Sequence, residues 1–269
     1  MANFILDAIY GFNYKKTFIW ENYRDHNDMY RDSVETNFWY NNDLLSFVGT
    51  GLSTTKSGVF NGGTVEGVYV SSPYRKLYIS EVDVSAKLIS SLIRKNTADS
   101  KAEIFKNIFS GDDDITLGSG ADVIDAFGGD DTVRGRGGND VIAAGAGNDV
   151  LFGGTGMDKL TGGAGADIFV FDAKASKKNI DTITDFSAKS DVISLDHLFF
   201  RGSHGGLGTL IEEEFRIGVK AQDEFDRVIY NNKTGALYYD ADGNGRAVAV
   251  QFAILNKGLA LTSDNFDIM

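Results

Sequence analysis

Residues 111–169 read GDDDITLGSGADVIDAFGGDDTVRGRGGNDVIAAGAGNDVLFGGTGMDKLTGGAGADIF, and the order Gly-x-Asp-x-apolar returns in them every nine residues, seven times over. The glycines are Gly111, Gly120, Gly129, Gly138, Gly147, Gly156 and Gly165. The aspartates are Asp113, Asp122, Asp131, Asp140, Asp149, Asp158 and Asp167, and the apolar residues are Ile115, Ile124, Val133, Ile142, Leu151, Leu160 and Phe169. A flexible glycine-rich linker, the alternative interpretation, needs no apolar residue at a fixed phase. The strict register therefore predicts a repeated, folded unit.

The nine-residue period predicts a parallel β-roll. Nine residues supply one short strand and one turn, so two repeats complete one coil, and the inward apolar residues stack eighteen residues apart. Glycine lets the turns adopt backbone conformations that are closed to residues with a Cβ. Aspartates eighteen residues apart then face each other, as the pairs Asp113/Asp131, Asp122/Asp140, Asp131/Asp149, Asp140/Asp158 and Asp149/Asp167. Two carboxylates and nearby carbonyls form a hard, all-oxygen shell that suits Ca²⁺. We therefore expect about five or more calcium ions.

These residues carry a family resemblance. Residues 109–171 resemble the RTX (repeats-in-toxin) β-roll, the hemolysin-type calcium-binding repeat of proteins that Gram-negative bacteria export by type I secretion. The resemblance implies that each ion also takes carbonyls from positions 2 and 4 of one turn and positions 1 and 3 of the facing turn. Carried onto this sequence, the implied metal-binding residues are Phe109, Gly111, Asp113, Gly118, Gly120, Asp122, Ala126, Phe127, Gly128, Gly129, Asp131, Gly135, Arg136, Gly137, Gly138, Asp140, Ala144, Gly145, Ala146, Gly147, Asp149, Gly153, Thr155, Asp158, Gly162, Ala164 and Asp167.

The segment that follows the repeats resembles the C-terminal domain of serralysin-type metalloproteases and of many rhizobial RTX proteins. The runs that carry this resemblance are Ala166–Phe171, Ile180–Phe186, Asp191–Leu195, Arg227–Tyr230 and Leu237–Gly243. The alternating apolar residues of two runs, Ile180, Ile183 and Phe186 and then Val192, Ile193 and Leu195, predict strands that continue the roll and cap its open edge. The resemblance further implies type I secretion, with an uncleaved signal that would end in Asn265-Phe266-Asp267-Ile268-Met269.

The motif Asp240-Ala-Asp242-Gly-Asn244-Gly245 fits the first half of an EF-hand loop. Its twelfth position is Gln251 and not a bidentate Glu, and its flanks predict strands and not helices. The motif is therefore either a polar hairpin turn without an ion or a weaker extra calcium site formed by Asp240, Asp242 and Asn244.

The charge is distributed unevenly along the chain. Of the net −12, residues 1–107 contribute nothing, with 12 Lys and Arg against 12 Asp and Glu, whereas residues 108–269 carry 14 against 26. Without an ion, facing aspartates repel one another, so we expect calcium binding and folding of the roll to be linked. The acidity also argues against nucleic acid as a partner.

Several functional classes lack their motifs. The chain has no cysteine, which excludes disulfides and thiolate metal sites. Its three histidines, His26, His197 and His204, form no His-Glu-x-x-His, and no G-x-S-x-G occurs, so neither a zinc protease nor a lipase is indicated. No apolar stretch is long enough for a transmembrane segment, and the N-terminus shows no signal peptide pattern.

The remaining residues predict a mainly β protein with four parts. We expect a small β-rich N-terminal domain in residues 1–83, a helical connector in 84–107, the β-roll in 108–171 and the serralysin-type domain in 172–269. In the first part, Asn61-Gly62-Gly63 predicts a hairpin between Ser57–Phe60 and Thr64–Val70, and Lys76–Val84 predicts a further strand. The segments 84–94 and 98–109 predict two amphipathic helices that cap the first coil of the roll.

The function predicted from the sequence is that of a secreted, non-enzymatic protein that folds on calcium outside a Gram-negative cell. Residues 1–107 hold 17 of the 32 aromatic residues, and we expect them to bind a cell surface or an exopolysaccharide. Two alternatives remain open: a polysaccharide-modifying lyase or epimerase, and a bacteriocin-like or membrane-active toxin.

Overall fold

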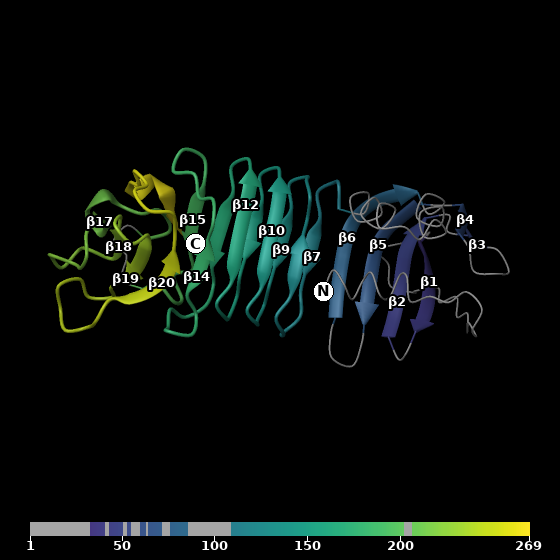
Figure 1. Cartoon of the computed structure of the whole chain (residues 1–269), viewed down its shortest axis with the longest axis horizontal. Coiled ribbons are helices and arrows are strands. Elements are labelled where there is room, and N and C mark those ends of the chain that lie inside the picture. Colours follow the sequence, from purple (N-terminus) through teal and green to yellow (C-terminus); the bar gives the residue numbers. More distant parts are fainter. Residues whose placement is uncertain are drawn as a thin grey trace. The chain divides into compact units, whose positions relative to one another are not determined.

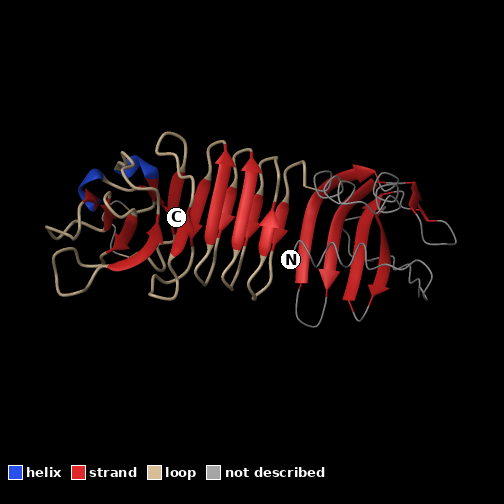
Figure 2. Ribbon diagram, viewed as in Figure 1, coloured by secondary structure: helices blue, strands red, loops and turns tan. Residues whose placement is uncertain are grey.

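The protein is mainly β. The computed structural model describes residues 109–201 and 206–269 in full, and between Ser33 and Ser85 it describes the backbone of six strands. The chain forms two compact units, Met1–Gly118 with Ala126–Thr132, and Ser119–Asp125 with Val133–Met269. Figure 2 shows the strands in red and, in blue, the 3-10 helices η1 (Glu212–Glu214) and η2 (Ser263–Asn265) of the second unit.

The first unit contains an antiparallel sheet whose strands lie in the order β1-β2-β5-β6-β7. Their bounds are β1 Ser33–Tyr40, β2 Asp43–Thr50, β5 Thr64–Ser71, β6 Lys76–Ser85 and β7 Asp114–Thr116, and the short strands β3 Ser53–Thr54 and β4 Phe60–Gly62 pair separately. Ile79 of β6 is paired with Ile115 of β7, the first strand of the repeats. The first repeat strand is therefore covered by a neighbouring antiparallel strand.

Two predictions for this region meet different outcomes. The strand predicted at Lys76–Val84 is confirmed as β6. The hairpin predicted around Asn61-Gly62-Gly63 is wrong, because β4 pairs with β3 whereas β5 pairs with β2 and β6. The helices predicted in 84–94 and 98–109 lie almost entirely outside the described residues, and β6 includes the residues at which the first helix was expected to begin.

The second unit contains most of the roll and the C-terminal domain, as two sheets that face each other (Figure 1). One follows the order β8-β10-β12-β14-β20-β19-β18-β17, and in the other the strands β11-β13-β15-β21-β16 are neighbours. The bounds are β8 Val123–Asp125, β10 Val141–Ala146, β11 Val150–Phe152, β12 Lys159–Ala164, β13 Ile168–Phe171, β14 Asp181–Ile183, β15 Val192–Leu195, β16 Gly208–Thr209, β17 Phe215–Ile217, β18 Val228–Asn231, β19 Ala236–Tyr239, β20 Val250–Ile254 and β21 Phe266–Ile268. Strand β9 (Thr132–Arg134) contains residues of both units.

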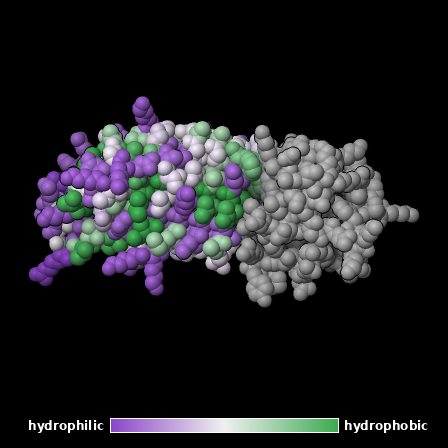
Figure 3. Space-filling model, in the orientation of Figure 1, coloured by the Kyte–Doolittle hydropathy of each residue, from purple (hydrophilic) through white to green (hydrophobic). Residues whose placement is uncertain are grey.

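The predicted stacking of inward apolar residues is confirmed. Ile142 is paired with Ile124 on one side and with Leu160 on the other, in parallel register. All seven apolar residues of the repeat are buried. Residues next to them in the strands face outward, so Val123 and Val141 stay exposed. Figure 3 shows that hydrophobic residues (green) lie among polar ones (purple) on the face it presents. Each fully buried Leu, Ile or Phe contributes about 1.5–3 kcal/mol, so the roll needs many stacked coils to be stable.

The C-terminal domain caps the roll with an aromatic core. Phe252 packs edge-to-face against Phe171 and Phe200, with ring centroids 5.0 and 5.2 Å away. Strand β14 is paired with both β12 and β20, so the repeat sheet runs into the domain without interruption. The strands predicted from the apolar residues of 180–186 and 191–195 are confirmed as β14 and β15, and those predicted on either side of the Asp240 motif are confirmed as β19 and β20. The final segment forms β21 between β15 and β16.

Turns of the roll require a left-handed residue at a position where the repeat usually has glycine. Gly145, Gly154 and Gly163 have φ of +117°, +85° and +105° there, but Phe127 and Arg136 hold the same position with φ of +65° and +67°. A left-handed conformation costs a residue with a Cβ roughly 1–2 kcal/mol, so these two turns are strained.

Replacement of Arg136 by glycine should stabilise the calcium-loaded protein. The side chain is exposed, so its loss removes no core contact, and the relief of strain exceeds the entropic cost of glycine by up to about 1 kcal/mol. We expect Arg136→Gly to raise Tm by about 2–4 °C in a thermal melt. The matched variant Gly154→Ala should lower Tm, because its Cβ would meet the carbonyl of Arg136. A lower Tm for Arg136→Gly would contradict the assignment of strain.

Candidate metal centres

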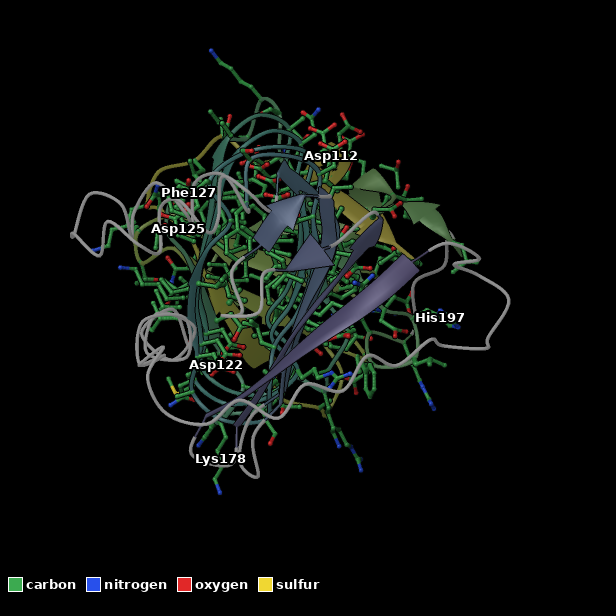
Figure 4. All side chains as sticks on the ribbon, turned by 90° about the vertical axis from the view of Figure 1, so that its right-hand side faces the viewer. Asp112, Asp122, Asp125, Phe127, Lys178 and His197 are labelled. Atoms are coloured by element: carbon green, nitrogen blue, oxygen red, sulfur yellow. The ribbon has the colours of Figure 1, made fainter. Side chains whose placement is uncertain are left out.

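The seven repeat aspartates form rows of buried carboxylates at the edges of the roll. Each aspartate directly precedes a strand, as Asp122 precedes β8 and Asp140 precedes β10, and so stands where the turn enters the sheet. All seven side chains are at most 3% exposed. Figure 4 looks along the strands' stacking direction and shows Asp122 and Asp125 at opposite ends of β8. The strand position that places the apolar residue in the core therefore also places the aspartate, two residues earlier, at the edge of the roll.

One oxygen of each facing carboxylate is held by the backbone of the preceding coil. The amide of Asp122 donates to Oδ1 of Asp140 at 2.8 Å, and the amide of Asp140 donates to Oδ1 of Asp158 at 2.7 Å. The same bond joins Asp113 to Asp131 at 2.8 Å and Asp149 to Asp167 at 3.1 Å. Four of the five predicted pairs are thus neighbours in the structure. Asp131 and Asp149 belong to different units, so their pairing stays a prediction.

The second oxygen is left without a protein partner in the middle of the row. Oδ2 of Asp140 and Oδ2 of Asp158 are buried and accept no hydrogen bond. A buried polar atom without a partner costs about 1–3 kcal/mol, and more when it is charged. An ion between the coils would supply the missing partner, and oxygen ligands of this kind suit Ca²⁺.

Burial raises the pKa of these carboxyls. Desolvation raises the pKa of Asp140 to about 7, and the charges of Asp158 and Asp122 add to the effect. Desolvation also raises the pKa of Asp167 to about 6, with contributions from Asp191 and Asp149. Without an ion, the carboxyl groups of these aspartates therefore favour the protonated form, because the fold brings negative charges together in a place that water cannot reach.

Backbone carbonyls lie beside the carboxylates. A Cβ on Gly135 would lie 2.7 Å from Oδ2 of Asp140 and would also meet the carbonyl oxygen of Gly153, so glycine keeps a gap that both oxygens border. Several of the carbonyls implied as ligands already accept a backbone hydrogen bond at 2.8 to 3.0 Å, among them those of Ala126, Gly135, Arg136, Thr155 and Ala164. A carbonyl has two lone pairs, so a carbonyl that accepts a single hydrogen bond keeps one for an ion. The carbonyl of Arg136 also accepts the hydroxyl of Thr155, at 3.4 Å.

Both rows continue beyond the repeats, which the nine-residue pattern does not predict. The amide of Asp158 donates to Oδ1 of Asp181 at 3.0 Å, and the amide of Asp167 donates to Oδ1 of Asp191 at 3.3 Å. Both new aspartates precede strands, β14 and β15, and both are buried. The signal was present as Asp181-Thr-Ile183 and Asp191-Val-Ile193, which keep the Asp-x-apolar order without the glycine.

The loop with Asp240, Asp242 and Asn244 is a hydrogen-bonded turn between β19 and β20. The carboxylate of Asp242 accepts the amides of Arg246 and Ala247 at 2.9 to 3.2 Å. The side-chain amide of Asn244 donates to the carbonyl of Gln222 at 3.1 Å. Strands and not helices flank the loop. Its polar groups thus serve the turn itself, and an extra calcium site there stays a weaker prediction.

The described residues offer no other kind of metal centre. Within 109–201 and 206–269, no three His, Asp or Glu side chains gather closely enough to hold an ion by themselves. Nδ1 of His197 lies 2.6 Å from the carbonyl of Met269, and Figure 4 shows this side chain away from the edge with Asp122. None of the helices in the described part is long and apolar enough to cross a membrane.

Comparison with known families identifies this architecture. The family described as "Peptidase M10 serralysin C terminal" matches residues 126–264, and the family described as "RTX calcium-binding nonapeptide repeat (4 copies)" matches residues 108–142. The chain belongs to the serralysin C-terminal family and carries RTX repeats. No protease domain is matched, and the two matched domains are non-catalytic. Together they fit type I secretion from a Gram-negative bacterium.

Solved structures to which the chain is similar include two subunits of a mannuronan C5-epimerase and one lipase. The AlgE6R3 subunit of the mannuronan C5-epimerase from Azotobacter vinelandii is 25% identical, with a TM-score of 0.27, over 58% of this chain and 78% of that chain. The AlgE6R2 subunit is 26% identical, with a TM-score of 0.33, over 55% and 86%. The extracellular lipase LipA from Serratia marcescens is 16% identical, with a TM-score of 0.37, over 87% and 31%. Among curated proteins, no match was found.

Without calcium, the roll should be more stable in mild acid than at neutral pH. Burial raises the pKa of Asp140 to about 7 and of Asp181 to about 8, so the folded rows bind protons that the unfolded chain has released. The stability that these groups contribute is fully present below their ordinary pKa of 3.8, falls as the pH rises above it, and is lost once the pH passes the folded values of about 7 and 8. Circular dichroism in EGTA should therefore show more β structure at about pH 5 than at about pH 8. An unfolded roll at both values, or the opposite order, would contradict this.

Proposed function

We propose that this chain is a secreted calcium-binding protein whose roll folds when Ca²⁺ enters the gaps between facing aspartates. The observation that carries the proposal is the row of buried carboxylates in which backbone amides hold one oxygen and Oδ2 of Asp140 and of Asp158 accepts no bond. The ion would neutralise the two facing charges and fill the missing contact. Calcium binding would thus be part of the folding free energy.

We assign the ion ligands residue by residue from the repeat. Each proposed site takes two aspartates eighteen residues apart and the carbonyls that the RTX resemblance implies. For the site between Asp140 and Asp158, these carbonyls belong to Arg136, Gly138, Gly153 and Thr155. Oδ2 of Asp140 and the carbonyl of Gly153 border the same gap next to Gly135, which supports the assignment.

Because folding of the roll would depend on calcium, the calcium concentration would decide where the roll folds. Extracellular calcium-binding modules have dissociation constants of about 10⁻⁴–10⁻³ M, far above the levels at which cytosolic sensors respond. In the low calcium of the cytoplasm the crowded carboxylates would keep the roll loose, which a narrow export channel requires. Outside, calcium would fold it.

Residues 1–107 would provide the biological target. Both matched families lie outside them, and they hold both tryptophans of the chain, Trp20 and Trp39. Aromatic side chains offer flat apolar faces with polar edges, which suit contact with sugars and other amphipathic surfaces. We therefore propose that this part binds a cell surface or an exopolysaccharide.

Calcium should convert the protein from a loose to a β-rich state. Circular dichroism of the full chain in EGTA and then in excess Ca²⁺ should show this gain. Asp140→Asn removes a carboxylate shared by two proposed sites and should raise the calcium midpoint on the order of tenfold, because affinity depends on ligand charge. Asp125→Asn is the control, because Asp125 lies at the opposite end of β8 from Asp122 (Figure 4). This variant should leave the calcium midpoint unchanged. A spectrum that calcium does not change would contradict the proposal.

The full chain should adhere to bacterial exopolysaccharide in calcium and elute in EGTA. Retention on immobilised exopolysaccharide or alginate measures this, with calcium-free buffer as the control. Unsaturated sugars in the flow-through would instead indicate a lyase, and leakage of dye from liposomes would indicate a membrane-active toxin. Absence of retention on every surface tested, with the roll folded, would contradict the binding role.

A further inference from the structure

Exposed charge is distributed unevenly between the two edges of the roll in the second unit. The turns that lead into β10, β12 and β14 form the edge at which Asp122 lies, and we call it the Asp122 edge. Four charged side chains of these turns are exposed, and all are basic: Arg136, Lys174, Lys177 and Lys178. Figure 4 shows Lys178 on the same edge as Asp122, and Asp125 on the other. The Asp122 edge therefore presents positive charge, although the chain as a whole is acidic.

The carboxylates at the Asp122 edge face inward. The row aspartates there are at most 2% exposed, and the remaining acidic side chain, Asp172, is half-buried. Lys177 and Lys178 stand only four and three residues before Asp181, so the charges of the row lie close behind them. Calcium between the row carboxylates would cancel this negative charge and leave the lysines as the exposed charge of the edge. The charge that the edge presents would thus depend on calcium.

Two of the lysines are displayed on an anchored turn. The amide of Asn179 donates to the carbonyl of Ser176 at 3.0 Å, so Lys177 and Lys178 are the central residues of this turn. Oδ1 of Asn179 accepts the amide of Gly156 at 2.6 Å, which fixes the turn to the preceding coil. The coil that contains the turn spans 23 residues, whereas a repeat coil spans 18. The longer coil thus holds two lysines at a fixed place on the edge.

Arg136 and Lys177 occupy equivalent positions on stacked turns. Arg136 stands four residues before Asp140, and Lys177 stands four residues before Asp181. One coil lies between them, and its Gly154 stacks on the backbone of Arg136. Neighbouring strands lie about 4.8 Å apart, so the two turns are about 10 Å apart along the edge. The cations therefore follow the direction in which the coils stack.

The conformation of Arg136 indicates that its side chain has a use other than stability. Its φ of +67° is left-handed, and glycine adopts this conformation at a lower cost. A strained backbone that is kept at an exposed position is a reason to infer a function there. The property that Arg136 has and glycine lacks is a long side chain with a positive charge.

The side chains around the cations indicate which anionic partner fits. Residues 135–139, 153–157 and 172–180 contain no aromatic residue, so these turns offer no ring that could stack on a sugar. Met157, in the turn between those of Arg136 and Lys177, is 52% exposed. An apolar side chain among flexible cations suits the headgroup region of an anionic lipid layer, in which phosphate groups can move to meet the charges.

We propose that the Asp122 edge of the calcium-loaded roll docks on an anionic lipid surface through Arg136, Lys174, Lys177 and Lys178. This inference rests on the proposed calcium binding, which neutralises the aspartates behind the lysines, and it gives the roll a partner separate from that of residues 1–107. Each cation close to such a surface strengthens binding about fivefold, and the effect fades within a Debye length. Docking is therefore reversible and is weakened by salt.

Co-sedimentation of the full chain with vesicles in calcium tests the edge. Vesicles of mixed phosphatidylglycerol and phosphatidylcholine should carry the wild type down, and vesicles of phosphatidylcholine alone should not. The double variant Lys177→Gln, Lys178→Gln should lower the partition coefficient on the order of twentyfold, because it removes two of the cations. Added salt should weaken binding of the wild type more than that of the variant, since screening acts on the charges that remain.

A matched control removes the same charge from the opposite edge. Lys189 follows β14, and Lys233 follows β18, which runs in the same direction as β14 because β19 is antiparallel to both β18 and β20 and β20 is parallel to β14. The double variant Lys189→Gln, Lys233→Gln should keep the partition coefficient of the wild type.

Arg136→Gly separates docking from stability. It should lower the partition coefficient about fivefold, because one cation is lost, while its Tm rises for the reason given above. A protein that is more stable and yet binds more weakly cannot owe the loss to unfolding. Circular dichroism in calcium confirms that every variant is folded.

The outcomes distinguish this inference from the proposed function. A wild type that folds on calcium but does not sediment with anionic vesicles would overturn the docking edge and leave the calcium sites standing. Equal sedimentation of the wild type and the Lys177→Gln, Lys178→Gln variant would also overturn it, because calcium itself would then bridge lipid and protein. Retention on an immobilised acidic polysaccharide in place of vesicles, lost in the same variant, would overturn the choice of lipid. A wild type that binds no calcium would overturn the proposed function itself.

Discussion

The structure depends on carboxylates that the backbone brings together away from water. Each aspartate enters a turn where the amide of the preceding coil holds one of its oxygens, so its position is set by the sheet and not by a counter-charge. Burial and the nearby carboxylates raise the pKa values, which shows that the fold alone does not favour the charged form. A divalent cation between coils would resolve the conflict, because it would replace both the lost water and the missing positive charge. In the function that we propose, the metal would therefore be a structural part of the roll, as a buried side chain is part of its core.

The same nine residues also explain why the roll is sensitive to its turns. Each strand buries one apolar residue of the repeat, so a single coil gains little and stability comes from stacking. Stacking requires that turns lie close together, and a Cβ on Gly154 would collide with the carbonyl of Arg136. The fixed positions of the apolar residue, the glycines and the aspartate within the repeat are thus three consequences of one geometry. A change in the position of any one of them disturbs the other two.

The sequence predicts the contacts that recur with the nine-residue period, and the prediction fails where the period changes. The buried apolar residues and four of the five facing pairs followed from a spacing of eighteen, since a parallel coil repeats its contacts at that interval. Asp181 and Asp191 were missed because their coils span 23 and 24 residues and lack the glycine. The hairpin at Asn61-Gly62-Gly63 failed for another reason. A turn signal is local, whereas the partner of β5 is decided by the whole sheet, in which β2 and β6 flank it.

A repeated structure must also end, and the ends show which parts of the repeat are essential. In the first unit, the repeat strand β7 gains its neighbour from β6, which runs antiparallel, so sheet pairing there does not require another repeat. In the second unit, β14 and β15 keep the Asp-x-apolar order but not the glycines, and they pair with β20 and β21 of the cap. The inward apolar residue and the edge aspartate are therefore kept in coils that no longer have the glycine turn. This order of loss is physically reasonable, because an unpaired strand edge or an unmatched buried carboxylate costs free energy at the last coil, whereas the tight glycine turn is needed only where another coil of equal length stacks upon it.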